Sequence, residues 1–399
     1  MNKRGEYNLG YKETRTGWIP SDWEIKRLSD LCTINYGDSP KNILNNSGNI
    51  PIVGTSETFR YADQSNIDGR TIVIGRKGSI DQPAYFDIPI WVIDTAFYTT
   101  GYKNIEPQWL YYFLSYHKLS RYNESTGVPS LSRNTLYTIK IPIPPLPEQQ
   151  KIAEIFKTWD QAIELLGKQI EAKERLKKAL MQQLLTGKMR FPGFGEPISS
   201  RGIPKNWIEA PLSQFFKEKN ERNHKNGTSL ILSCSKLYGI IAQSERFDKR
   251  IAAKDISRYK VVQKNNLVYD PMLLWDVSIG FLKNYEEGVV SPAYSTFTYI
   301  GDQDTFEYLR QLIYSHELRH YYKVISQGTN RRRRKATSST FLKLRIKLPA
   351  NHGELIKIRD MLSGLDDEII MLEKRKEAFQ KQKQGLMQKL LTGEVRVKV

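Results

Sequence analysis

A heptad-patterned stretch over residues 147–187, PEQQKIAEIFKTWDQAIELLGKQIEAKERLKKALMQQLLTG, decides the fold of this chain. Its apolar residues alternate spacings of four and three, which is the seam of a coiled coil. They are Ile152, Phe156, Trp159, Ile163, Leu166 and Ile170, continued by Leu176, Leu180 and Leu184. Pro147 suits the first helical turn and Gly187 suits the end of the helix. Such a helix would run about 60 Å at about 1.5 Å per residue, so it needs a partner helix.

A second copy of this stretch supplies the partner. It runs from Glu354 to Gly393, and subtracting 185 from 391 gives an offset of 206 between the two Leu-Leu-Thr-Gly endings. The seam of the second copy is formed by Ile358, Leu362, Leu365, Ile369, Leu372, Phe379, Leu386 and Leu390. We therefore expect two helices, over 147–190 and 351–399, that pair with each other. Two unrelated, solvent-exposed helices are the alternative.

Each long helix follows a globular region that opens with the same pattern. Ile19-Pro20 and Trp23 return as Ile203-Pro204 and Trp207, and 207 minus 23 gives an offset of 184. The two offsets differ because loops between the repeated motifs vary in length. Short β-branched runs broken by turn residues predict strands, for example over 71–74, 91–93, 139–141, 267–269 and 344–346. Each region should also contain one helix, over 108–122 and 306–325.

These patterns predict an α+β fold in pseudo-twofold repeat. The first globular domain should occupy residues 1–146 and the second residues 191–350, and each should be followed by a long helix. The formal charge of +18 favours nucleic acid as the partner, because clustered Lys and Arg displace counterions from a phosphate backbone. A merely basic protein, or one that binds an acidic protein, is the alternative.

The composition also bounds the compartment. No apolar run approaches the roughly 18 residues that span a bilayer, and the charged N-terminal segment has no signal-peptide core. We therefore expect a cytoplasmic protein with no membrane contact. Cys32 and Cys234 lie in separate halves without metal-type or redox-type spacing, so both are expected to be reduced thiols.

Basic, hydroxyl-rich loops are the candidate DNA contacts. Arginine can bind guanine through two hydrogen bonds, whereas Lys, Ser, Thr and Asn commonly hold phosphates or adenine edges. In the first domain the candidates are Arg76, Lys77 and Ser79 on a glycine turn, with Ser130, Ser132, Arg133 and Asn134 before the last strand. In the second domain they are Asn330, Arg331, Arg332, Arg333, Arg334, Lys335, Thr337 and Ser338. A structural turn and a solvated charge run are the respective alternatives.

The segment His316-Glu317-Leu318-Arg319-His320 has the spacing of a zinc-protease motif on a predicted helix. The internal repeat argues against this interpretation, because at an offset of 199 Glu317 corresponds to Lys118 and His320 to Arg121. No third ligand stands at the usual spacing, and no nucleotide-binding or methyltransferase motif stands out. We therefore predict neither a catalytic residue nor a metal site in this chain. A metalloprotease is the alternative, and zinc analysis would test it.

The combined motifs carry a family resemblance. Two globular domains that open with Ile-Pro-x-x-Trp, each followed by a Pro-led helix ending Leu-Leu-Thr-Gly, resemble the specificity subunit of type I restriction-modification systems over the whole chain. The segment PLPEQQKI at 145–152 is similar to the family's helix start, and GRKGSI at 75–80 resembles a glycine-serine turn of its recognition domains. The second half departs at both places, with PANHGE at 349–354 and DPMLLW at 270–275.

The resemblance implies a subunit that reads DNA and performs no chemistry itself. In this family each target-recognition domain reads one half of a bipartite, asymmetric double-stranded site, and the two helices pair antiparallel and set the spacer. The helices also dock two modification subunits, which methylate adenine with S-adenosylmethionine. Restriction subunits then complete an endonuclease that uses ATP and magnesium. A two-domain coiled-coil scaffold or an RNA-binding protein, without sequence-specific DNA recognition, is the alternative.

Overall fold

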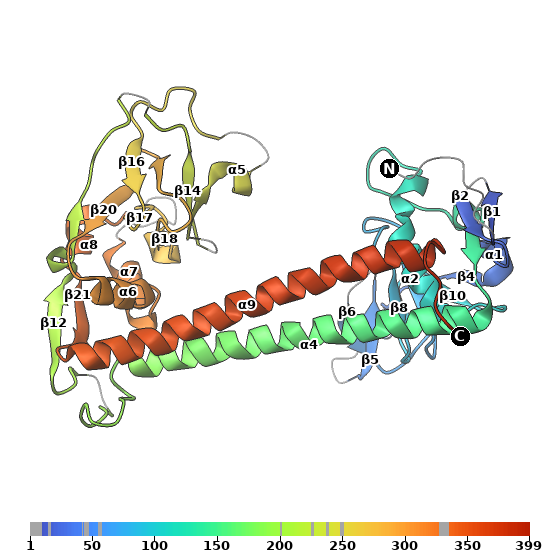
Figure 1. The fold of residues 1–399 in the computed structure, drawn as a ribbon, viewed down its shortest axis with the longest axis horizontal. Coiled ribbons are helices and arrows are strands. Elements are labelled where there is room, and N and C mark those ends of the chain that lie inside the picture. Colours follow the sequence, from blue (N-terminus) through green and yellow to red (C-terminus); the bar gives the residue numbers. More distant parts are fainter. Residues whose placement is uncertain are drawn as a thin grey trace. The chain divides into compact units, whose positions relative to one another are not determined.

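The chain forms two compact units, both of which include part of each long helix. The computed structural model describes residues 10–14, 17–41, 43, 48–54, 58–199, 202–224, 227–236, 239–247, 251–326 and 335–399. Unit 1 comprises Met1–Lys168 with Glu373–Val399, and unit 2 comprises Gln169–Leu372. Helix α4 (Leu146–Leu184) and helix α9 (His352–Leu391) are each continuous (Figure 1). The boundaries between the units therefore fall inside α4 and α9, whereas the sequence predicts each long helix as a segment of its own. None of the helices within the described ranges is long and apolar enough to cross a membrane.

Unit 1 is built on a four-stranded antiparallel sheet in the order β4-β10-β7-β8. These strands are β4 (Thr33–Tyr36), β10 (Ala96–Thr100), β7 (Thr71–Gly75) and β8 (Ala84–Phe86). Helix α2 (Pro107–His117) packs on β7 and β8, and every residue of β7 is buried. The other strands are β1 (Tyr11–Thr14) with β2 (Gly17–Pro20), β3 (Glu24–Arg27) with β11 (Lys140–Ile143), and β5 (Ile50–Val53) with β6 (Thr58–Ala62) and β9 (Trp91–Val92). The short helices are α1 (Leu28–Leu31), η1 (Leu119–Tyr122) and α3 (Arg133–Tyr137).

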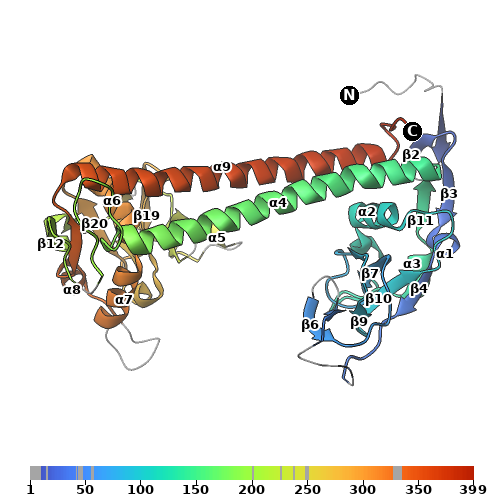
Figure 2. The same ribbon diagram turned by 90° about the horizontal axis from the view of Figure 1, so that it is seen from below.

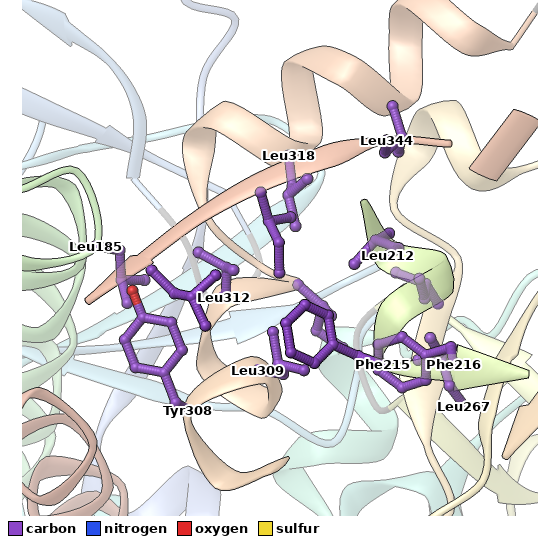
Figure 3. Packing of buried hydrophobic residues seen from close by; sticks show 14 of the residues in the cluster. Leu185, Leu212, Phe215, Phe216, Leu267, Tyr308, Leu309, Leu312, Leu318 and Leu344 are labelled. Atoms are coloured by element: carbon purple, nitrogen blue, oxygen red, sulfur yellow. The ribbon is translucent and has the colours of Figure 1, made fainter. Parts of the chain in front are cut away.

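Unit 2 repeats this sheet in the corresponding order β13-β20-β17-β18. Its strands are β13 (Phe216–Glu218), β20 (Ser295–Tyr299), β17 (Leu267–Tyr269) and β18 (Ile279–Phe281). The other strands are β12 (Trp207–Pro211) with β21 (Arg345–Pro349), β14 (Leu232–Ser235) with β15 (Gly239–Ala242), and β16 (Lys260–Gln263) with β19 (Glu287–Val290). The short helices are η2 (Leu212–Gln214), α5 (Gln243–Arg246), η3 (Leu274–Asp276), α6 (Gln303–Leu312), α7 (His316–Ile325) and α8 (Ser338–Leu342). Figure 3 shows the core of this unit, where Leu309 and Leu312 of α6 lie beside Leu318 of α7.

Two predicted helices were wrong because each is two helices in the structure. The segment predicted as one helix over 108–122 breaks after α2, where Lys118 adopts a left-handed φ of 55°. The segment predicted over 306–325 divides into α6 and α7, because the Ser315 side chain accepts a hydrogen bond from the backbone N–H of Leu318 and caps a new helix. A capping serine inside an otherwise periodic stretch marks this second boundary.

Both cysteines are buried. Cys32 and Cys234 are free thiols in the structure. Burial raises the pKa of each thiol to about 12, so both are protonated at neutral pH.

The seam of the long helices continues through lysine rather than leucine. After Ile170 the spacings of three and four reach Lys173 and Lys177, whereas Leu176, predicted to prolong the seam, is 45% exposed. That prediction was therefore wrong. Lys173 is half-buried and pairs with Glu368 of α9, so its charge is neutralised by the partner helix.

The remaining seam residues differ in burial. Those that are buried are Ile152, Phe156, Leu166, Leu184, Ile358, Leu362, Leu365 and Leu390. Those that are half-buried are Trp159, Ile163, Leu180, Ile369, Leu372, Phe379 and Leu386.

In unit 1 a hydrogen-bonded cross-link joins the sheet-packing helix to both long helices. Asp160 of α4 accepts a hydrogen bond from the Tyr112 hydroxyl of α2 at 2.8 Å and pairs with Lys383 of α9 at 2.5 Å. Burial raises the pKa of the Tyr112 hydroxyl, so it stays a donor. Nearby, the rings of Trp159 and Phe379 meet edge to face at 5.3 Å. These contacts align α4 and α9 in this unit.

Unit 2 contains the same cross-link in its own helices. Asp366 of α9 accepts a hydrogen bond from Gln311 of α6 at 2.8 Å and pairs with Lys177 of α4 at 2.5 Å. The differences 366 minus 160 and 383 minus 177 both equal 206, which is the offset between the helix copies. Within this unit Lys173 meets Glu368 while Lys177 meets Asp366, so α4 and α9 pair antiparallel, side by side (Figure 2).

The end of α4 docks on the opening motif of the second globular region. Arg190 donates two hydrogen bonds to the Glu354 carboxylate, at 2.8 and 2.7 Å, and the Trp207 indole donates a third at 3.1 Å. The side chains of Arg190 and Glu354 are 1% and 0% exposed. Gly187 has φ +71°, and a Cβ there would lie 2.2 Å from Cγ of Pro204, so this contact requires glycine. The Leu-Leu-Thr-Gly and Ile-Pro-x-x-Trp motifs are therefore two parts of one junction.

The end of α9 makes the matching junction in unit 1. Arg396 donates to both oxygens of Glu148 at 2.7 Å, and the Trp23 indole donates to the same carboxylate at 3.2 Å. Gly393, with φ +75°, would place a Cβ 2.4 Å from Cδ of Pro20. The residues that follow each long helix thus pack against the opening Ile-Pro-x-x-Trp motif of the other repeat.

Reversing the charge of Lys177 is expected to weaken the helix register. Lys177→Glu faces Asp366 with a like charge, and the free energy of unfolding should fall by about 1–2 kcal/mol. Adding Asp366→Lys restores an attraction, so the double variant should recover most of that loss in urea unfolding. Lys264→Glu, at an exposed pair with Glu286, is the control for charge reversal alone. Purely additive losses in the double variant would show that this pair does not hold the register.

Candidate nucleic-acid interface

In unit 1 the structure brings together the two loops predicted to contact DNA. The carbonyl of Arg76, just after β7, accepts a hydrogen bond from the N–H of Leu131 at 3.0 Å, and Lys77 forms a β-bridge with Ser130. The N–H of Gly78 donates a further hydrogen bond to the carbonyl of Pro129, and the φ of +84° at this position favours glycine. The two loops, more than 50 residues apart in the sequence, therefore form one surface.

Two arginines of this surface stack on one tyrosine. The guanidinium carbons of Arg76 and Arg133 lie 5.2 and 5.1 Å from the ring centroid of Tyr36, at the end of β4. Tyr36 is 44% exposed, and its ring meets the buried ring of Phe97 in an edge-to-face arrangement with the centroids 5.1 Å apart. One N–H of Arg76 donates to the carbonyl of Asp94 at 3.3 Å. Stacking restrains both guanidinium groups at the surface, which lowers the entropy lost when they bind a base or phosphate.

The first-domain hydroxyl and amide candidates have different surroundings. Ser132 caps α3, because its hydroxyl oxygen accepts from the N–H of Thr135 at 3.1 Å and the hydroxyl donates to Glu124 at 2.8 Å. Hydrogen bonds from Thr135 and Ser132 hold the pKa of the Glu124 carboxyl below its ordinary value. The side chains of Lys77, Ser79 and Asn134 are exposed, and that of Ser130 is half-buried.

In unit 2 the corresponding loop is described only in part. The predicted contacts Asn330, Arg331, Arg332, Arg333 and Arg334 lie outside the described residues. Lys335 is exposed, and Thr337 caps α8 by accepting a hydrogen bond from the N–H of Thr340 at 3.2 Å. The N–H of Ala336 donates to the carbonyl of Pro271 at 3.0 Å, much as Leu131 bonds to Arg76 in unit 1. The same two loops therefore meet in both units.

Ser338 reaches an acidic residue that the sequence patterns did not indicate. Its hydroxyl donates to Glu218 at 2.7 Å and lies 3.0 Å from the hydroxyl of Ser295. Glu218 ends β13 as Tyr36 ends β4, and each pairs with a phenylalanine of the next strand. Neither Tyr36 nor Glu218 is among the residues predicted from the sequence to contact DNA. A usable signal existed, because 218 minus 36 is 182, close to the 184 that separates the repeated tryptophans.

The motif with zinc-protease spacing is held by ordinary polar contacts. Glu317 accepts hydrogen bonds from Lys347 and Tyr321, both at 3.4 Å, and His316 and His320 are exposed. These residues line a cavity of about 710 Å³ between α7 and the end of α4. Within the described parts of the chain, the three-residue group close enough to hold a metal lies elsewhere, at Asp302, Asp304 and His352. In that group Asp302 caps α6, and Asp304 pairs with His352 at 2.8 Å and with Arg359.

The first half of the chain matches a known family model. Residues 20–175 match the model described as the type I restriction modification DNA specificity domain. The type I restriction enzyme MjaVIII specificity subunit of Methanocaldococcus jannaschii is 24% identical over 430 aligned positions, covering 97% of this chain and 96% of the relative. The MjaIX specificity subunit of the same organism is also 24% identical, over 97% of this chain and 96% of the relative.

Solved structures share the fold. The S subunit of the type I restriction-modification system from M. genitalium superposes with a TM-score of 0.60 at 13% identity, covering 92% of this chain and 96% of that chain. A chain from a study of assembly and conformational transition of the type I R-M system gives a TM-score of 0.54 at 14% identity, covering 94% of this chain and 99% of that chain. The α+β repeat with long paired helices is therefore the fold of these proteins.

Proposed function

We propose that this chain, which belongs to the type I restriction-modification specificity subunits, reads a bipartite, asymmetric double-stranded DNA site with one half-site per globular region. The observation that carries the proposal is the surface on which Arg76 and Arg133 stack on Tyr36. Stacked guanidinium groups suit the O6 and N7 acceptors of guanine and the phosphate oxygens. The net charge of +18 adds the nonspecific attraction that DNA binding requires.

Specificity subunits perform no catalysis, so the chemistry of the complex belongs to other chains. We propose that the long helices dock two modification subunits that methylate adenine, and that restriction subunits join them. Six large apolar side chains on these helices are exposed, which supports a docking role; they are Leu146, Leu165, Leu176, Met361, Ile370 and Met371. We place S-adenosylmethionine, ATP and magnesium on the partner subunits, and the complex in the cytoplasm, where its DNA lies.

A competition assay on the full chain separates this function from an RNA-binding or scaffold role. A random duplex pool is selected on the chain at fixed salt, and the recovered duplex then competes with random duplex and with RNA of equal length. The expected result is enrichment of two short conserved blocks separated by a fixed spacer, and about 10³-fold preference over random duplex. Equal retention of all duplexes, or preference for RNA, would contradict the proposal.

A further inference from the structure

The two globular regions carry unlike residues at one equivalent place. Tyr36 and Glu218 each end the first strand of the repeated sheet, opposite Phe97 and Phe297 respectively. The residues that follow confirm the alignment. The backbone N–H of Gly37 donates to the carbonyl of Ala96 in β10, and the backbone N–H of Lys219 donates to the carbonyl of Thr296 in β20. The place is therefore defined by backbone pairing, independently of the side chains.

The side chains that meet at this place also differ between the units. Arg133 is the first residue of α3, after its cap Ser132, and Ser338 is the first residue of α8, after its cap Thr337. In unit 1 the guanidinium of Arg133 therefore stacks on Tyr36, whereas in unit 2 the hydroxyl of Ser338 donates a hydrogen bond to the carboxylate of Glu218. One unit presents hydrogen-bond donors and the other presents an acceptor.

Hydrogen bonds through Ser338 hold the carboxylate of Glu218 in position. Its Oε1 accepts from Ser338 at 2.7 Å, and the Ser338 hydroxyl lies 3.0 Å from Ser295, which is 5% exposed. The nearby cations have other hydrogen-bonded contacts, since Lys219 pairs with Glu221 at 3.1 Å and Lys260, although the charge of Glu218 acts on it, donates to a backbone carbonyl. In the described part of the chain, no lysine or arginine forms an ion pair with Glu218. An exposed carboxylate is thus left on a surface of a strongly basic protein.

We propose that Glu218 is a specificity-determining residue that accepts a hydrogen bond from the exocyclic amino group of cytosine in the half-site read by unit 2. A carboxylate accepts from cytosine N4, whereas it repels the acceptor edges of guanine and thymine, the N7 acceptor beside the amino group of adenine, and the phosphate backbone. The arginines that stack on Tyr36, the equivalent residue of unit 1, select the opposite edge, that of guanine. This inference rests on the proposed function and explains how one scaffold reads two different half-sites.

The test is selection of a random duplex pool by the full-length wild-type chain and by Glu218→Gln. Glutamine keeps the size of the side chain but pairs with the N6 and N7 of adenine. We expect wild type to select cytosine at one position of one half-site, and Glu218→Gln to lose that preference about tenfold or to select adenine there, with the other half-site unchanged. Ser338→Ala, which frees the carboxylate, should weaken the cytosine preference at the same position.

Two controls keep the outcomes distinguishable. Glu286→Gln removes an exposed carboxylate of the same unit that pairs with Lys264, and it should leave both half-sites unchanged. Circular dichroism and thermal unfolding establish that Glu218→Gln is folded. If wild type selects a site and Glu218→Gln selects the identical site, the specificity role of Glu218 is refuted while the proposed function stands. If wild type shows no sequence preference, both fail.

Discussion

Replacing Glu354 with alanine lowers the free energy of unfolding by about 3–5 kcal/mol, because it leaves a buried guanidinium without its counter-charge. Arg190 is 1% exposed at its side chain and donates two hydrogen bonds to this carboxylate. The Trp207 indole loses its acceptor as well. Urea unfolding followed by circular dichroism measures the loss. Glu286→Ala, at an exposed pair, should cost less than about 1 kcal/mol and serves as the control.

Two further variants show that the cost comes from the stranded charge. Glu148→Ala, in the matching junction, should cost less, because Arg396 is 38% exposed at its side chain and keeps two hydrogen bonds to Asp22 at 2.9 Å. Arg190→Met combined with Glu354→Met replaces both ions with apolar side chains, and should recover most of the loss. Equal losses for Glu354→Ala and Glu148→Ala, without recovery in the double variant, would contradict this account.

Removing both stacked arginines reduces affinity for the selected duplex by about 10²- to 10³-fold. Arg76→Ala with Arg133→Ala deletes two guanidinium groups, and one bidentate contact to guanine contributes about 1–3 kcal/mol of discrimination. Affinity for random duplex should fall much less, so the ratio of specific to nonspecific binding shrinks. Fluorescence anisotropy at several salt concentrations measures both quantities. A uniform loss on all sequences, with a salt slope lower by about two, would assign the arginines to phosphates instead.

The tyrosine beneath the arginines provides a second measurement. Tyr36→Leu keeps both guanidinium groups and removes the ring that restrains them, so the specific affinity should fall by about tenfold, less than in the double arginine variant. Arg70→Ala is a matched control, because this exposed arginine of the same unit pairs with Glu106 at 3.2 Å. If Tyr36→Leu binds as wild type, the stacking does not restrain the arginines.

The periodic parts of the fold could be predicted from sequence because helix periodicity is a local property. The seam from Ile152 to Ile170 and the repeated endings are visible in the sequence alone. The predicted continuation is wrong at Leu176, because the strict spacing of the seam leads to Lys173 and Lys177, which are not apolar. Both lysines are neutralised by acids of the partner helix, Glu368 and Asp366, and that pairing depends on the register.

The candidate site was less predictable because it depends on backbone pairing between distant segments. The arginines and hydroxyls of both unit 1 loops are visible in the sequence, but the contact between the loops depends on hydrogen bonds such as that from the N–H of Leu131 to the carbonyl of Arg76. Tyr36 and Glu218 gave no compositional signal, since a single tyrosine or glutamate at a strand end is common. Their offset of 182 is close to the 184 of the repeated tryptophans, but the pairing of both residues with a phenylalanine of the next strand is what shows that they share one place.

The reciprocal junctions have a consequence for how such a chain can be assembled. Each repeat contributes a proline-tryptophan head and a glycine-arginine tail, and each tail fits the head of the other repeat. One repeat alone therefore holds every side-chain type that both junctions need, so two identical half-length polypeptides would carry a self-complementary set. The connectivity of the two repeats is therefore cyclic in this respect.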